Sequence, residues 1–109
     1  MYTEKDFTII TDVFREHVPG LKALILFGSY ARGTAQDDSD ADIAAIVEKP
    51  VPRAEKLTIL NKIWQVLGRM GYRTDIIFKD IEQFEDDKQI PVTMAYEIDQ
   101  EGKLLWMKN

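Results

Sequence analysis

Apolar and polar positions follow one another along this chain in blocks of changing period, and the blocks predict alternating helices and strands. Residues 21–27 and 41–48 are short apolar runs of strand length. Because 41–48 is apolar on both faces, we expect it to be a buried central strand. Further runs at 72–78 and 103–107 complete a predicted sheet of three to four strands.

Two long helices are predicted, one before the first two strands in the sequence and one after them. Thr3 and Asp6 have the spacing of a capping box, and Pro19 with Gly20 ends the helix that they open. A second helix is expected over 53–69. One face of each should lie in the core, because apolar residues recur there at helical spacing. These are Phe7, Ile10, Val13 and Phe14 in the first helix, and Leu57, Leu60, Ile63, Trp64 and Leu67 in the second.

Three shorter helices complete the pattern. One is expected to begin at Ser29 and to be stopped by Gly33. A second, acidic one covers 80–87, and a third covers 90–98 with Pro91 in its first turn. Strands and helices together predict an α/β (α+β) fold, a small mixed sheet flanked by helices. A length of 109 residues predicts one domain over 1–109 with a single hydrophobic core.

The composition excludes several classes of function. The chain has 19 acidic and 14 basic residues, no cysteine and the single histidine His17. Disulfides, thiolate metal sites and histidine-rich zinc sites are therefore excluded. The net charge of −5 lacks the basic stripe with which proteins grip a nucleic-acid backbone. With no signal-peptide core and no apolar run of membrane-spanning length, we expect a cytoplasmic protein that contacts neither membrane nor nucleic acid directly.

Negative charge is concentrated toward the end of the chain. One lysine, Lys88, stands among eight acids: Asp80, Glu82, Glu85, Asp86, Asp87, Glu97, Asp99 and Glu101. Two readings stay open: a solvated surface, which is the more common case, or a docking face for a basic partner.

The chemistry-bearing residues are gathered around Gly28-Ser29 and, after ten further residues, Asp40-Ala41-Asp42. Residues two apart on a strand share a face, so Asp40 and Asp42 should aim at one spot. Gly28 lets a phosphate approach the backbone, and Ser29 adds a hydroxyl at a helix start. A phosphate cradle that faces paired carboxylates indicates metal-dependent nucleotide chemistry. Alone, the two aspartates would more simply cap a loop.

Arg32 and the aromatic residues each have more than one possible role. Arg32 has two equally weighted readings: a contact to the triphosphate, or an ion pair with Asp37 or Asp38 that orders the loop. Tyr30 is expected to pack rather than to stack on a base. Trp64 and Trp106 are expected in the core or at an interface.

The segment FGSYARGTAQDDSDAD resembles the signature of the minimal nucleotidyltransferases, within the polymerase-beta-like nucleotidyltransferase superfamily. TDIIF, with Asp75, fits the place of the family's third carboxylate, and EIDQEGKLLW resembles its final helix, turn and strand. The small pair Ala44-Ala45 departs from the larger aliphatic residues usual there. Since the helix over 53–69 implies a right-handed parallel crossover, Asp75 should lie beside Asp42.

The resemblance implies a catalytic set. Asp40, Asp42 and Asp75 would hold two Mg²⁺ ions, with Mn²⁺ as the alternative, because three close carboxylates repel one another without a cation. Gly28 and Ser29, with Arg32 as a further candidate, would bind the nucleotide. Asp75 would lie nearest the acceptor hydroxyl.

The resemblance also implies a role. The family's antitoxins transfer AMP from ATP to a tyrosine of a small helical RNase toxin, with which they form a hetero-oligomer; a homodimer is the other assembly to consider. Two alternatives remain: an antitoxin that protects by binding alone, and nucleotidyl transfer to a small molecule such as an aminoglycoside.

Overall fold

The computed structural model describes all 109 residues and contains one mixed sheet with five helices. The sheet has the order β3-β2-β1-β4, in which β1 pairs antiparallel with β2 and β4, and β2 pairs parallel with β3. The elements are α1 (Glu4–His17), β1 (Leu21–Phe27), α2 (Gly28–Arg32), β2 (Ala41–Val47), α3 (Arg53–Arg69), β3 (Thr74–Asp80), α4 (Ile81–Asp87), α5 (Met94–Glu101) and β4 (Lys103–Met107).

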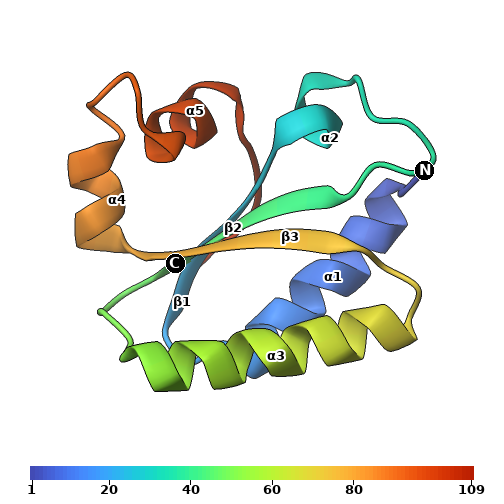
Figure 1. Ribbon diagram of the computed structural model, residues 1–109, viewed down its shortest axis with the longest axis horizontal. Coiled ribbons are helices and arrows are strands. Elements are labelled where there is room, and N and C mark those ends of the chain that lie inside the picture. Colours follow the sequence, from blue (N-terminus) through green and yellow to red (C-terminus); the bar gives the residue numbers. More distant parts are fainter.

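The helices lie on both sides of the sheet (Figure 1). Helices α1 and α3 cover one face, and α4 and α5 cover the other, with α2 at the end of β1. Each face has its own apolar cluster. Ala45 belongs to the cluster under α1 and α3, while Ala44 belongs to the smaller one under α4 and α5. The mixed sheet between helices, with β2 as a buried inner strand, confirms the predicted fold class.

Local signals located several elements correctly. The capping box of α1 is present, since the Thr3 hydroxyl accepts from the Asp6 amide and the Asp6 carboxylate accepts from the Thr3 amide. β1, α3 and β4 have the predicted bounds. β3 begins at Thr74 and runs to Asp80, two residues later at each end than expected. None of the helices has the length and apolarity needed to cross a membrane.

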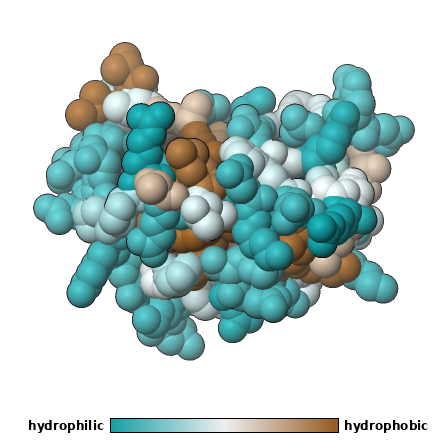
Figure 2. Space-filling view, turned by 60° about the horizontal axis from the view of Figure 1, so that its bottom comes forward, coloured by the Kyte–Doolittle hydropathy of each residue, from teal (hydrophilic) through white to brown (hydrophobic).

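Two predictions about helices were wrong. On α3, Leu57 and Trp64 are 46% and 42% exposed, because the buried face is centred on Ile63 and Leu67 and extends to Ile59 instead. Figure 2, which brings the lower side of the molecule in Figure 1 forward, shows a mainly hydrophilic surface broken by hydrophobic patches.

The last helix does not begin at Ile90. It begins at Met94, because the Thr93 hydroxyl caps it by accepting from the Tyr96 amide, and Pro91 lies in the preceding turn.

Candidate nucleotide-binding site

The sheet brings the motif residues together at one of its ends. β1 ends at Phe27, directly before Gly28, and Phe27 is the antiparallel register partner of Asp42. On the other side of β2, Asp42 is the parallel register partner of Asp75. Asp42 lies between two buried neighbours, Ala41 and Ile43, that belong to the cluster under α1 and α3. Because side chains alternate along a strand, Asp42 lies on the face covered by α4 and α5.

Gly28 and Asp42 are in direct contact. Gly28 has φ of +68°, a conformation that glycine adopts without strain, and a methyl group built there would overlap the Asp42 carboxylate. A side chain at position 28 is therefore excluded twice, by the backbone and by Asp42. The result is a bare backbone turn placed against a carboxylate.

The electrostatics of Asp42 reflect this crowded position. Burial raises the pKa of Asp42, and the neighbouring carboxylates of Asp75 and Asp40 raise the pKa further. Arg32 acts in the opposite direction on the same pKa. Asp42 is therefore near enough to both other predicted carboxylates to feel their charge. A bound cation would relieve the repulsion.

Asp40 is turned toward a cation that sequence reasoning did not single out. The Asp40 Oδ1 atom lies 3.4 Å from Nε of Arg73, and both side chains are exposed. No group of three or more acidic, histidine or cysteine side chains is gathered closely enough to hold a metal ion in this arrangement. The structure thus places Asp42 and Asp75 side by side on neighbouring strands. Asp40 lies near Asp42 but forms an ion pair with Arg73. The only sequence signal for Arg73 is a cation two residues before Asp75.

Arg32 has partners that lie far away in the sequence. Its Nη1 atom is 3.5 Å from Glu97 and 3.4 Å from Glu101, both on α5. Of the two alternatives for Arg32, the pairing with Asp37 or Asp38 is wrong, because α2 packs beside α5 and Arg32 pairs there with Glu97 and Glu101. A contact from Arg32 to a triphosphate stays a prediction.

Ser29 lies in a short helix that has a C-cap but no side-chain N-cap. α2 begins at Gly28, one residue earlier than expected, and no side chain caps its first turn. Gly33 ends it in the left-handed conformation, as predicted. Tyr30 is buried and stacks on Tyr2 at 5.4 Å between ring centroids, which confirms its packing role.

The three predicted ligands are of the chemical type that suits a divalent cation, although Asp40 is paired with Arg73 and the three carboxylates are not gathered around one point. Three carboxylates supply hard oxygen ligands of the kind that Mg²⁺ and Mn²⁺ prefer. Burial is the main cause of the raised pKa of Asp42, and the smaller contribution from Asp75 and Asp40 is the part that a bound cation would offset. The absence of a side chain at Gly28 lets the Asp42 carboxylate lie directly against the backbone of this turn.

Comparison with known proteins identifies the family of the chain. Residues 8–103 match the sequence model of the nucleotidyltransferase domain, and the chain belongs to this family. It is similar to the protein adenylyltransferase MntA of Shewanella oneidensis, with 25% identity over 97 residues that cover 89% of this chain and 62% of that protein. The chain spans about three fifths of the length of the curated relatives that it matches.

Solved structures share the fold. A toxin–antitoxin complex with AMP-PNP contains a chain that matches with a TM-score of 0.64 and 23% identity, covering 95% of this chain and 75% of that one. A complex of the tri-AMPylated Shewanella oneidensis HEPN toxin with its MNT antitoxin gives a TM-score of 0.60 at 19% identity, covering 97% and 74%. Both likenesses lie in the fold, a mixed sheet flanked by helices.

Proposed function

We propose that this chain is a metal-dependent nucleotidyltransferase that transfers AMP from ATP to a tyrosine of a partner toxin, and so acts as an antitoxin. The observation that carries the proposal is the Gly28–Asp42 contact beside Asp75, which places a glycine turn against a pair of carboxylates. Membership of the nucleotidyltransferase family supports the reaction class. The similar protein from Shewanella oneidensis is named a protein adenylyltransferase, which supports a protein acceptor.

The residues have distinct proposed tasks. The backbone at Gly28 and Ser29 would hold the β- and γ-phosphates, and Asp40 and Asp42 would be ligands of two Mg²⁺ ions, or of Mn²⁺. When bound, the metal supplies positive charge that activates the attacking hydroxyl and stabilises the leaving pyrophosphate. Asp75 completes the ligand set nearest the acceptor and takes the proton of the acceptor hydroxyl. Arg32 would contact the triphosphate after leaving Glu97 and Glu101.

The partners follow from the same proposal. ATP is the donor, supported by the AMP-PNP in a structure of the same fold. The acceptor is a small helical RNase toxin, supported by the tri-AMPylated HEPN toxin found with an MNT antitoxin of this fold. We propose a hetero-oligomer with that toxin, or a homodimer that presents two sites. We also propose that residues 1–109 act as one catalytic domain in the cytoplasm.

The test is a transfer assay with the intact partner. The chain is incubated with Mg²⁺, ATP and the product of the adjacent gene, and the mass of each protein is then measured. We expect the partner to gain one or more AMP units, located on tyrosine by peptide mapping. Asp42→Asn should eliminate the gain.

Two outcomes would redirect the proposal. If Asp42→Asn still neutralises the partner, then protection comes from binding alone. If the chain consumes ATP with an aminoglycoside and no protein, then the acceptor is a small molecule.

A further inference from the structure

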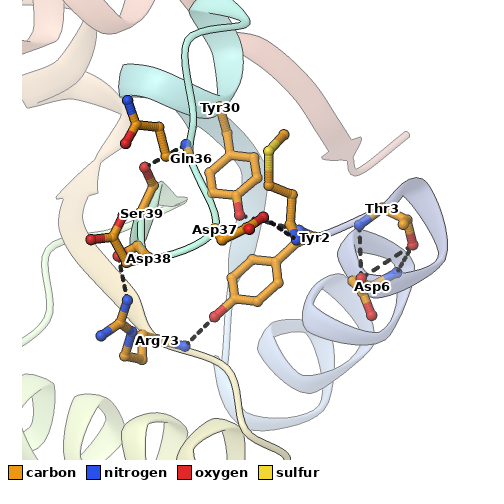
Figure 3. A network of polar contacts seen from close by, with 10 residues as sticks. Tyr2, Thr3, Asp6, Tyr30, Gln36, Asp37, Asp38, Ser39 and Arg73 are labelled. Carbon is orange, nitrogen blue, oxygen red and sulfur yellow. Dashed lines mark hydrogen bonds and ion pairs between the residues drawn. The ribbon is translucent and has the colours of Figure 1, made fainter.

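Arg73 contacts the segment that leads into β2 at three points. Its backbone carbonyl oxygen accepts from the Ala41 amide at 3.0 Å, as part of the parallel ladder. Its side chain donates from Nη2 to the carbonyl oxygen of Asp38 (Figure 3) and approaches the Asp40 carboxylate with Nε at 3.4 Å. Arg73, the residue directly before β3, thus contacts the backbone before Asp40, the Asp40 side chain and the residue after Asp40.

The guanidinium is the group suited to this arrangement. It is planar and presents donors in a fixed fork, so one side chain reaches a carbonyl and a carboxylate at once. A lysine ammonium carries the same charge on one atom and would satisfy only one of the two. Arg73 and Asp40 are 60% and 55% exposed, so an ion pair between them alone would contribute little. The value of Arg73 lies in joining the loop carbonyl to the carboxylate.

Tyr2 in turn holds the backbone of Arg73 through a hydrogen bond. The Tyr2 hydroxyl accepts from the Arg73 amide at 2.7 Å, and the Tyr2 amide donates to the Tyr30 hydroxyl at 3.1 Å. The rings of Tyr2 and Tyr30 are stacked, and Tyr72 meets the Tyr2 ring edge-on. Figure 3 shows Tyr2 and Tyr30 of this cluster between the first turn of α1, the loop at Gln36–Ser39 and Arg73. Arg73 is therefore anchored on the same aromatic cluster that carries α2.

We infer that Arg73 is a positioning residue, which holds Asp40 and its loop in place before metal and nucleotide bind. The inference rests on the proposed function, because it assigns Asp40 to the metal site. In the metal-free protein the guanidinium offsets the charge of Asp40 and ties the loop to β3. Removing it frees the loop, so that metal binding must first order it.

The test compares Arg73→Ala and Arg73→Lys with the unmodified chain. Arg15→Ala is the matched control, since Arg15 is 51% exposed and forms an ion pair with Asp12 away from the motif. Hydrogen exchange of the Gln36, Ser39 and Ala41 amides is measured without metal. All three are hydrogen-bonded in this segment. The affinity for Mn²⁺ in the presence of AMP-PNP is measured by electron paramagnetic resonance.

We expect Arg73→Ala to speed exchange at these three amides while the amides in the middle of α1 are unchanged. Mn²⁺ affinity should fall about 10-fold, the scale of residues that orient metal ligands. The exchange rates and Mn²⁺ affinity of Arg73→Lys should be intermediate between those of Arg73→Ala and those of the unmodified chain. Arg15→Ala should have the same exchange rates and affinity as the unmodified chain.

Three results would overturn the inference. They are unchanged exchange and affinity in Arg73→Ala, tighter Mn²⁺ binding in that variant, and full retention of both properties in Arg73→Lys. If Arg73→Ala does not fold, Arg73→Lys decides the matter on the same measurements. If the unmodified chain binds no Mn²⁺, the proposed function fails, but the exchange rates still decide whether Arg73 positions the loop.

Discussion

The Asp42 carboxylate fills the space in which a side chain at Gly28 would lie. The two residues are brought there by different strands, since Gly28 follows β1 and Asp42 is the second residue of β2. Each one constrains the other. Any residue larger than glycine at position 28 would displace the carboxylate, and displacing the carboxylate would remove a predicted metal ligand.

Gly28→Ala should therefore be far more damaging than the same change at Gly33. Both glycines have positive φ, but a methyl group at Gly33 would meet nothing within 4 Å. We expect Gly33→Ala to lower the free energy of unfolding by about 1 kcal/mol, from backbone strain alone. Gly28→Ala should cost about 2–4 kcal/mol, because overpacking against Asp42 is added. Urea denaturation of both variants measures the difference, and equal costs would contradict the contact.

Asp42→Asn should separate activity from stability. Transfer should fall by about three orders of magnitude, since the charge that a metal supplies is worth several kcal/mol to the transition state. The metal-free protein should gain stability at neutral pH. Because the pKa of Asp42 is raised in the folded state, the unmodified protein loses stability as the pH rises from the unfolded-state pKa through the folded-state pKa of this group. The stability gained by Asp42→Asn should therefore vanish at pH values below both pKa values. Denaturation at several pH values, with a transfer assay, checks both. A less stable variant at neutral pH would favour a loop-capping role.

Metal and nucleotide together should stabilise the fold. The raised pKa of Asp42 shows that its negative charge is held at a cost that a cation removes. A ligand present at 100 times its dissociation constant adds about 2.7 kcal/mol to the unfolding free energy. We expect the thermal midpoint to rise with Mg²⁺ and AMP-PNP together, and to rise less in Asp42→Asn. An unchanged midpoint at saturating ligand would count against the site.

Tyr72→Phe should reduce the loss of folding stability that occurs as the pH is lowered into the acidic range. The pKa of Asp6 is lowered, first by the Thr3 amide and then by the Tyr72 hydroxyl, which donates to it at 2.7 Å. The stability that this carboxylate contributes is present above its unfolded pKa and is lost as pH falls through its folded pKa. Without the hydroxyl, the pKa of Asp6 should move up toward its ordinary value. Carboxyl NMR titration of Asp6 measures this shift, and an unmoved pKa would show that the Thr3 amide suffices.

The acidic C-terminal stretch should behave as a solvated surface. Six of its eight acids have partners: Asp80 caps α4, Asp87 pairs with Lys79, Glu85 and Asp99 pair with Lys88, and Glu97 and Glu101 pair with Arg32. Reversing the remaining two, Glu82 and Asp86, to lysine should change partner modification by less than about 3-fold, the scale of exposed charges. A 10-fold or larger loss that disappears at high salt would instead identify a docking face.

The sequence predicted the site best where the signals were local or topological. The register of Asp42 with Asp75 followed from one rule, that a helix between parallel strands crosses over in the right-handed sense. The bounds of α3 followed from Pro52 before it and Gly71 after it. Both predictions needed only the order of elements and no side-chain contacts.

Other features depended on packing that a linear pattern does not contain. Arg32 meets Glu97 and Glu101, which lie 65 and 69 residues away, so nearby Asp37 and Asp38 were the wrong candidates. On α3, Leu57 and Trp64 continue the apolar stripe in sequence but fall on its solvent side, because α1 and β3 select the face that is buried. Pro91 and Thr93 both signal helix starts, and the hydroxyl cap of Thr93 prevailed.

The position of β1 inside the sheet has a consequence for the order in which the site matures during synthesis. β1 pairs on one side with β2 and on the other with β4, whose residues are the last of the sheet to be translated. Gly28, Ser29 and all three aspartates are translated well before β4 and before the glutamates that hold Arg32. A nascent chain thus carries every motif residue while one side of β1 is still unpaired. Since such distant pairings form late, the turn at Gly28 should reach its final geometry only once β4 has left the ribosome.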